Sequence, residues 1–398
     1  MKGIDLALVN PNSRELFGGL SEFTAIEPPF WAGLIASFVR EHGLEVRIID
    51  AEAEDWSSGQ TAEKIAESNP RLVVITLQGQ APTTSSTPKM PAASRLLNHL
   101  KREAPEVKTM LWGLHPSALP EKTLREEPVD FVCQGEGFYT IVNLLHQLRT
   151  WGGRFVGANG LWYLNHGNVI PSPRAPLLVS ERLPAVAFDL LPMDKYRAHN
   201  WLCLDDLDRR QPYGITYTSL GCPFKCFFCS AHALYKGIGS PSVRFRNPEM
   251  VIKEIGLLVE QYGVRNIKFM DEILNLREDH LTRICDLIIE RHYDLNMWAE
   301  VSIPTMTPKM LDKMKKAGIN WLAYGIESAV ESVRHGISKG FTQDKARGII
   351  EMTREAGINI EGNFCFGLPE DTMETMRATL DIAKAYNFEW VNFYCTIA

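Results

Sequence analysis

Three cysteines lie close together in the sequence, at Cys222, Cys226 and Cys229. Thiolates from one loop can hold three corners of an iron–sulfur cubane and leave the fourth iron free for another ligand. Zinc is the alternative, because His232 would complete a Cys3His set of the kind that binds zinc tetrahedrally. Buried thiols without a metal are a poor explanation, since three of them would crowd one turn. The spacing therefore favours a 4Fe-4S cluster bound by these three cysteines.

The other five of the eight cysteines are scattered singly through 398 residues, too sparsely for a disulfide scaffold. Apolar residues make up 45% of the chain and charged residues 23%, as in ordinary globular domains. The 42 basic and 48 acidic side chains give a net charge of −6, so nucleic acid is not an expected partner. No apolar stretch reaches the roughly 18 residues of a membrane span, and no signal peptide is recognised. We therefore expect no membrane span and a cytoplasmic location.

In the N-terminal third, short apolar strands alternate with helical patterns, and these elements must position any ligand bound there. The predicted strands cover residues 4–9, 44–49, 72–77, 107–112 and 129–133. The predicted helices include residues 30–42, 92–103 and 138–148. Strands this apolar are covered on both faces, which predicts a doubly wound parallel sheet that binds ligands at the carboxyl ends of its strands. The loops at those ends contain no G-x-G-x-x-G fingerprint and no Walker loop, which disfavours a dinucleotide or a nucleoside triphosphate.

The C-terminal half also alternates predicted strands and helices, with a different spacing from that of the N-terminal third. The predicted strands cover residues 214–220, 266–270, 296–301, 321–326, 358–366 and 390–395. The predicted helices cover residues 248–262, 279–292, 308–317, 343–356 and 371–386. Gly263, Gly318 and Gly357 each follow a predicted helix, where a positive φ ends it. Six strands alternating with five helices predict a partial (β/α)6 barrel, with the cysteine loop directly after the first strand, where such barrels carry their active sites.

The expected fold class is therefore α/β, with three parts along the chain. A doubly wound domain covers residues 1–150, a proline-punctuated connector without periodicity covers 151–208, and the barrel covers 209–398. The chain stops shortly after an apolar strand without a closing helix. We therefore expect the barrel to be truncated at its C-terminal end.

The cysteine loop, Cys222-x3-Cys226-x2-Cys229 with the aromatic Phe228 before its last cysteine, resembles the signature of the radical SAM superfamily. Further motifs agree with it: Phe-Met-Asp-Glu at 269–272, Tyr-Gly-Ile-Glu-Ser at 324–328, Lys-Gly at 339–340 and Phe-Gly-Leu-Pro at 366–369. With the N-terminal domain, nearly the whole chain resembles the cobalamin-binding radical SAM proteins. That class includes radical methyltransferases and the anaerobic porphyrin ring cyclase.

The resemblance implies a site for S-adenosylmethionine at the mouth of the barrel. The amino and carboxylate groups of this molecule would chelate the unligated iron, with Phe228 near its adenine. Asp271 or Glu272 would accept hydrogen bonds from the amino group, and a carboxylate facing an ammonium and a sulfonium is sensible electrostatics. The ribose hydroxyls or the amino acid moiety would meet residues at the ends of the next two strands, Glu300, Glu327 and Ser328.

The same resemblance implies cobalamin in the N-terminal domain. The Asp-x-His-x-x-Gly motif, which supplies a histidine to cobalt in better-known cobalamin domains, is absent, so base-off binding without a histidine ligand is expected. Gln78 is then a candidate neighbour of the lower corrin face, and His115 is the alternative. Gly113 belongs to a loop that resembles a cofactor cradle, while Gly135 and Gly137 would permit close approach of the nucleotide tail.

By resemblance, the chain would cleave S-adenosylmethionine reductively at the 4Fe-4S cluster and make a 5′-deoxyadenosyl radical, chiefly to methylate an unactivated carbon. A radical cyclase or rearrangement enzyme is the second reading, and a zinc-stabilised binding module without catalysis is the third. The expected partners are a small-molecule substrate and an electron donor such as flavodoxin or ferredoxin. Which substrate is used does not follow from the sequence.

Overall fold

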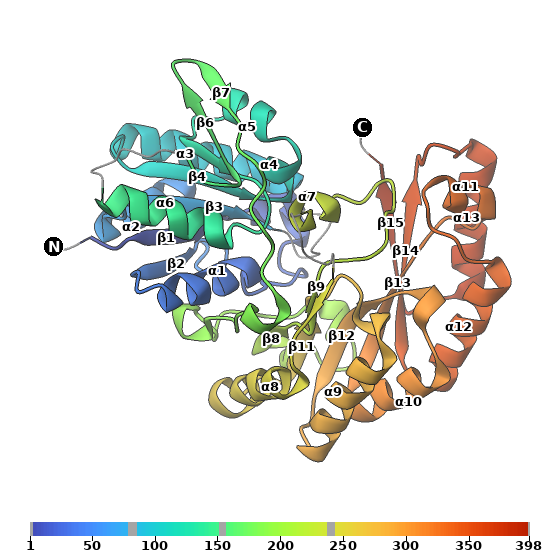
Figure 1. The fold of residues 1–398 in the computed structure, drawn as a ribbon. Helices are drawn as coiled ribbons and strands as arrows, with labels where there is room; N and C mark the ends of the chain where they lie inside the picture. Colours follow the sequence, from blue (N-terminus) through green and yellow to red (C-terminus); the bar gives the residue numbers. More distant parts are fainter. Residues whose placement is uncertain (1–2, 79–85, 151–156, 237–242, 397–398) are drawn as a thin grey trace. The chain divides into compact units, whose positions relative to one another are not determined.

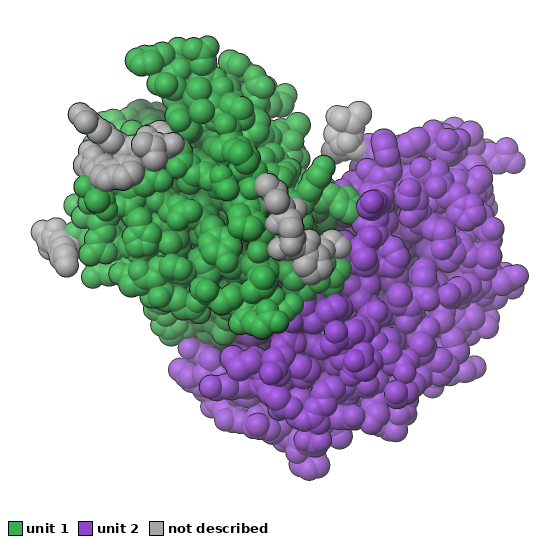
Figure 2. Space-filling model, in the orientation of Figure 1, with its two compact units in different colours: residues 1–199, 230–244 green, residues 200–229, 245–398 purple. Residues whose placement is uncertain are grey.

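The computed structural model describes residues 3–78, 86–150, 157–236 and 243–396. The chain divides into two compact units, drawn as a ribbon in Figure 1 and coloured separately in Figure 2. Unit 1 contains residues 1–199 and 230–244, and unit 2 contains residues 200–229 and 245–398. Most of the predicted connector thus groups with unit 1, and a short segment directly after the cysteine loop returns to that unit. None of the described helices combines the length and the apolar character that crossing a membrane requires.

Unit 1 is built on a seven-stranded sheet with the order β2-β1-β3-β4-β5-β6-β7. Its strands are β1 (Leu6–Asn10), β2 (Val46–Asp50), β3 (Leu72–Leu77), β4 (Lys108–Gly113), β5 (Phe131–Cys133), β6 (Leu161–Asn165) and β7 (Asn168–Ile170). The first five pair in parallel, whereas β6 and β7 are antiparallel to their neighbours. The predicted doubly wound parallel sheet is confirmed.

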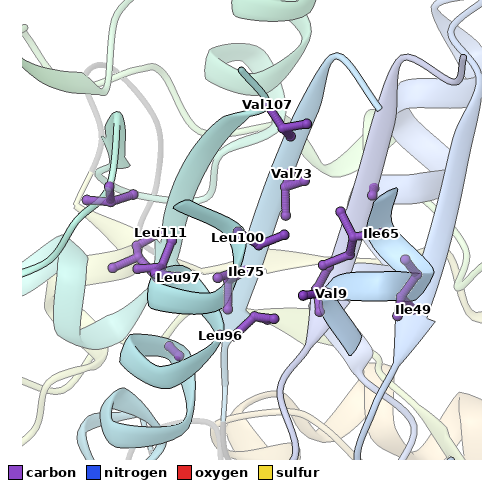
Figure 3. Packing of buried hydrophobic residues seen from close by; sticks show 14 of the residues in the cluster. Val9, Ile49, Ile65, Val73, Ile75, Leu96, Leu97, Leu100, Val107 and Leu111 are labelled. Atoms are coloured by element: carbon purple, nitrogen blue, oxygen red, sulfur yellow. The ribbon is translucent and has the colours of Figure 1, made fainter. Parts of the chain in front are cut away.

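Helices cover the sheet of unit 1 on both faces. They are α1 (Phe30–Glu41), α2 (Ser58–Ser68), α3 (Met90–Glu103), α4 (Leu114–Ala118), α5 (Pro120–Glu126), α6 (Phe138–Thr150) and α7 (Ala231–Tyr235). On one face, Ile65 of α2 and Leu96 of α3 pack against Val9 and Ile75 of the sheet (Figure 3). Each such side chain contributes roughly 1.5–3 kcal/mol by leaving water. This core fixes the strand ends that carry the loops.

The antiparallel strands β6 and β7 lie in the segment expected to be a connector without regular structure. His166 and Gly167 join them, and both have positive φ, 49° and 80°. A two-residue loop with positive φ at both positions is the type I′ turn, whose twist matches that of a hairpin. The segment therefore extends the sheet instead of running over the surface.

Unit 2 contains a six-stranded parallel sheet with the order β15-β14-β13-β12-β11-β8. These strands are β8 (Tyr213–Thr216), β11 (Asn266–Phe269), β12 (Asn296–Val301), β13 (Ile319–Glu327), β14 (Asn359–Phe366) and β15 (Trp390–Cys395). Two short strands precede β11, namely β9 (Ser219–Leu220) and β10 (Arg244–Phe245). Because the strands follow one another in chain order, the sheet forms the wall of the predicted partial barrel.

Helices alternate with these strands as the sequence predicts. They are α8 (Pro248–Tyr262), α9 (Glu278–Glu290), α10 (Pro308–Ala317), α11 (Glu331–Gly336), α12 (Gln343–Glu355) and α13 (Met373–Tyr386). Gly263 and Gly318 cap α8 and α10 with φ of 67° and 90°, and Gly357 follows α12 with φ of 72°. The three predicted helix ends are confirmed.

A tryptophan closes the inner face of this sheet near the starts of its strands. Trp201 packs its ring against Trp298, Trp321 and Trp390, at centroid distances of 5.4, 5.0 and 6.2 Å. Trp201 thus connects β12, β13 and β15 through the packing of aromatic rings.

Candidate functional site

The cysteine loop begins where the first barrel strand ends. β9 follows β8 closely, and Gly221 turns the chain into the loop with φ of 98°. The backbone N–H of Cys229 donates to the carbonyl of Cys226 (3.1 Å), and the N–H of Phe227 donates to the carbonyl of Ile337 (3.1 Å). The loop is thus folded on itself and tied to the chain after α11.

Cys222, Cys226 and Cys229 form no disulfide, and all three are partly exposed. Burial raises the pKa of Cys222 to about 11 and raises that of Cys226, while the ammonium of Lys339 opposes both shifts. Within the described ranges, no three His, Cys, Asp or Glu side chains are gathered closely enough to chelate one metal ion. Three corners of a cubane bind separate irons, so their thiols stand further apart. This donor set fits a 4Fe-4S cluster.

Asp271, directly after β11, anchors the base of the cysteine loop. Its carboxylate is buried and accepts hydrogen bonds from Thr218 N (2.8 Å), Thr218 Oγ1 (2.6 Å) and Ser219 Oγ (2.7 Å). Burial raises its pKa and these hydrogen bonds oppose the rise. The contacts make Asp271 a residue that positions the loop. Of the two acids predicted for the amino group, Glu272 is the one whose charge acts on the Cys222 thiol.

A buried ion pair missed by the sequence reasoning holds the strand below the loop. Arg246 donates to both carboxylate oxygens of Glu254 (3.0 and 3.2 Å) and to the carbonyl of Tyr217 (3.0 Å). Thr216 Oγ1 also donates to Glu254 (2.7 Å). Nothing in the sequence pairs Arg246 with an acid in the next helix, although two charges in otherwise apolar surroundings are a signal that could have been followed.

Glu327, at the end of β13, is buried and forms an ion pair with the partly exposed Lys339. Lys339 lies in a motif of the sequence but was given no role there. Lys339 Nζ donates to Glu327 Oε1 (2.6 Å). Burial acts to lower the pKa of Lys339, but the Glu327 carboxylate outweighs it and raises that pKa. A side chain at Gly325 would place its Cβ 2.5 Å from Lys339 Nζ and 2.6 Å from Glu327 Oε1. Glycine therefore lets the two side chains lie against β13, and a larger residue would displace their charged ends.

The remaining barrel residues predicted to meet S-adenosylmethionine have different surroundings. Ser328 is buried, and its Oγ lies 3.3 Å from Thr379 Oγ1 and accepts from the N–H of Val330 (3.2 Å). Glu300 is half-buried in β12, and its charge raises the pKa of Glu361. Phe228 is 38% exposed, so its ring is accessible to a ligand. The roles predicted for Phe228, Glu300 and Ser328 stay predictions.

In unit 1, Gln78 follows β3 at the carboxyl edge of the sheet. Its Oε1 accepts a hydrogen bond from the N–H of Trp31 (3.2 Å) at the start of α1. Its Nε2 is buried and makes no hydrogen bond among the described residues. A buried amide with a spare donor is suited to meeting a polar ligand atom. Gln78 therefore fits the predicted place beside cobalamin.

His115 lies in α4 and forms hydrogen bonds with other residues of the chain. Its Nδ1 lies 3.0 Å from Thr87 Oγ1, and its backbone N–H donates to Ser86 Oγ (3.0 Å). Partial burial, followed by the charge of Lys122, lowers its pKa. The side chain therefore stays neutral at physiological pH and is held by a hydroxyl.

The three glycines predicted to cradle cobalamin differ in how much room they leave. A Cβ at Gly113 would lie 2.3 Å from the carbonyl oxygen of Leu77, and one at Gly137 would lie 2.7 Å from Trp112 Nε1. At these two positions, the space that a side chain would fill is taken by other atoms of the protein, not left for a ligand. At Gly135 the nearest atom to a Cβ is Leu234 O, 3.6 Å away. The carbonyl of Gly135 accepts a hydrogen bond from Trp112 Nε1 (3.0 Å). Gly135 therefore best suits the predicted approach of a ligand.

Comparison with known proteins agrees with both halves of this description. Residues 19–145 match the B12 binding domain, and residues 216–383 match the radical SAM superfamily. The chain is 30% identical over 395 residues to an uncharacterised methyltransferase of Pyrococcus horikoshii, covering 99% of this chain and 80% of that protein. It is 27% identical over 397 residues to the anaerobic magnesium-protoporphyrin IX monomethyl ester cyclase of Rubrivivax gelatinosus, covering 97% of this chain and 66% of that one.

Among solved structures, the radical S-adenosylmethionine methyltransferase TsrM of Kitasatospora setae, with cobalamin and a [4Fe-4S] cluster bound, shares the fold. The TM-score is 0.77 at 19% identity, and the match covers 99% of this chain and 72% of that one. The cysteine loop, the B12 binding domain and the extent of these matches lead to one conclusion: the chain is an enzyme of the cobalamin-dependent radical SAM family.

Proposed function

We propose that the chain methylates an unactivated carbon of a small molecule. The observation that carries this proposal is the methyltransferase relative, which is similar to this chain over 99% of its length and therefore through both the B12 binding domain and the barrel. The barrel keeps all three cluster cysteines at the strand edge where such enzymes react.

When bound, the cluster supplies the electron that cleaves S-adenosylmethionine and cobalamin supplies the methyl group. Cys222, Cys226 and Cys229 would hold the cluster, with Asp271 fixing the base of their loop. Glu272 would orient the amino group of S-adenosylmethionine, and the ion pair of Glu327 and Lys339 would shape the neighbouring strand end. The barrel would exclude water from the reacting carbon.

The partners belong to the same proposal. A small-molecule substrate is supported by a solved TsrM structure described with a tryptophan substrate and an S-adenosylmethionine analogue. Reductive cleavage requires an electron donor, for which flavodoxin or ferredoxin is the expected class. A cytoplasmic location would suit an enzyme that needs a reduced cluster.

The test follows products of the anaerobically reconstituted full chain with S-adenosylmethionine that carries a deuterated methyl group. With a metabolite extract as the substrate source, we expect 5′-deoxyadenosine and S-adenosylhomocysteine in near-equal amounts, together with a labelled methyl group in a product. Cyclase relatives define the rival outcome. Formation of 5′-deoxyadenosine with neither S-adenosylhomocysteine nor a labelled product would replace methylation by cyclisation or rearrangement.

Cysteine variants test the metal directly. Cys222→Ala, Cys226→Ala or Cys229→Ala should each lose the brown colour, about four irons per chain and all cleavage of S-adenosylmethionine. Cys395→Ala is the matched control, because Cys395 is exposed and lies outside the loop. Stoichiometric zinc without labile sulfide in the unaltered protein would instead favour the zinc reading.

A further inference from the structure

The inner face of the barrel sheet holds a carboxylate with one unpaired oxygen. Glu361 in β14 is only 5% exposed. Its Oε1 accepts a hydrogen bond from Asn392 Nδ2 in β15 (2.6 Å), whereas its Oε2 is buried and makes no hydrogen bond within the described part of the chain. Leaving a buried acceptor unpaired costs about 1–3 kcal/mol, so the fold retains Glu361 against a penalty.

Strand register places Glu361 on one row with Glu300. In the parallel pairings, Glu300 of β12 is opposite Ala323 of β13, and Ala323 is opposite Glu361. Residues in register on neighbouring parallel strands point to the same face of the sheet. The two carboxylates therefore flank a residue whose side chain is a single methyl group.

The other groups that face Glu361 are few. Lys268 of β11 acts on it electrostatically but also lies 4.3 Å above the ring of Trp298. Asn392, which donates to Glu361, also donates to Asn363. Alongside burial, the charge of Glu361 contributes to raising the pKa of Tyr394 in β15. Burial, and next the charge of Glu300, raise the pKa of Glu361 to about 8. Without a ligand, this carboxyl group therefore holds a proton at neutral pH.

Other buried acids of this chain serve the fold and are paired. Glu254 is bound by Arg246, Glu327 by Lys339, and Asp271 by hydroxyl and backbone donors. Glu361 differs, because Asn392 donates to one of its oxygens while the other is buried and makes no hydrogen bond among the described residues. A cation with N–H donors would satisfy this oxygen of Glu361.

We propose that Glu361 and Asn392, with Glu300 on the same row, form a subsite in the barrel that binds a protonated amine of the substrate. This inference rests on the proposed function, because it names the substrate class of that enzyme. Binding would transfer the Glu361 proton to the solvent and leave a carboxylate paired with the ammonium group.

Butylammonium chloride is the probe, added to the cofactor-loaded full chain. Calorimetry in buffers of different ionisation enthalpy should show release of about one proton per bound amine at pH 7. Infrared difference spectra should show loss of a protonated carboxyl band. Butanol, which has the same length without charge, should not bind at this subsite.

Glu361→Gln should weaken amine binding at least about tenfold and abolish both the proton release and the infrared signal. Glu351→Gln, on the exposed side of α12, is the matched control and should behave like the unaltered protein. Asn392→Ala keeps Glu361 and should weaken binding while preserving proton release. It keeps the inference testable if Glu361→Gln folds poorly.

Absence of saturable amine binding to the unaltered protein, or equal binding to Glu361→Gln, would overturn the inference. Binding is measured without turnover. Loss of amine binding with intact transfer of the labelled methyl group therefore refutes the subsite alone. Amine binding without any methyl transfer refutes the proposed methylation instead.

Discussion

A Cβ at Gly325 would meet the charged ends of Lys339 and Glu327, at 2.5 and 2.6 Å, so these ends would have to shift. Gly325→Ala should push the ammonium away from the carboxylate and cost about 1–3 kcal/mol of unfolding free energy, as overpacking usually does. Binding of S-adenosylmethionine should weaken as well, because this pair shapes the end of β13. Urea denaturation and equilibrium binding would measure the two effects.

Gly348 provides the comparison for that prediction. It lies inside α12, and a Cβ there would meet nothing within 4 Å. Gly348→Ala should therefore stabilise the protein by roughly 0.5–1 kcal/mol through helix propensity, with unchanged ligand binding. Equal destabilisation by both variants would show that the contact at Gly325 is not the cause.

Asp50, at the end of β2, makes the stability of unit 1 depend on pH. It accepts from Tyr196 OH (2.8 Å) and Asn10 Nδ2 (2.8 Å), yet burial raises its pKa from 3.8 to about 6. Between these values the folded chain binds more protons than the unfolded chain. Its contribution is therefore fully present below about pH 4 and is lost as the pH rises through 6.

The measurement is urea unfolding across that window. The unfolding free energy should fall with rising pH, by at most about 1.4 kcal/mol per pH unit from this group. Asp50→Asn should remove this slope, because it cannot ionise. A slope that persists in Asp50→Asn would assign it to another group.

At the scale of elements, the hairpin of β6 and β7 depends on its two-residue turn. His166 adopts φ of 49°, which asparagine adopts more readily than histidine. His166→Asn should stabilise the hairpin by a few tenths of a kcal/mol, and His166→Val should destabilise it by about 1–2 kcal/mol. Amide hydrogen exchange of β6 would report both changes, with β3 as the internal control.

The same hairpin shows which elements the sequence reveals. Strands β1, β3 and β4 are continuous apolar runs, so their parallel pairing between helices follows from pattern alone. β6 and β7 are short and half-exposed, and their turn uses His-Gly in place of the commoner Asn-Gly. Because they also lie in a region rich in proline, the sequence pattern did not predict them.

The candidate site divides in a similar way. The cysteine loop stands out in the sequence because its spacing is local, and the binding of a cluster by Cys222, Cys226 and Cys229 stays a prediction. The ion pair of Arg246 with Glu254, the Lys339 partner of Glu327 and the saturation of Asp271 depend on contacts made only when distant segments fold together. Geometry of that kind cannot be derived from one sequence.

For the molecule as a whole, one ion pair joins the late segment of unit 1 to its sheet. Arg244 donates to both oxygens of Glu136, at 3.0 and 2.5 Å, and both side chains are buried. Arg244→Met should leave Glu136 uncompensated and destabilise unit 1 by about 3–5 kcal/mol. Adding Glu136→Gln should recover part of that loss.

Urea unfolding followed by tryptophan fluorescence would measure these variants, because Trp31 and Trp112 are buried in unit 1. The control is Arg125→Met, which removes an exposed pair with Glu121 and should cost less than about 1 kcal/mol. A double variant as unstable as Arg244→Met would refute the ion-pair explanation.

Residues 230–244 complete unit 1, although they follow the cysteine loop in the chain. The ribosome delivers the chain from its N-terminus, so the first 199 residues emerge while Glu136 still lacks Arg244. Residues 200–229, with all three cluster cysteines, are synthesised next. Unit 1 therefore cannot reach its final form during translation until the cysteine loop has already been made.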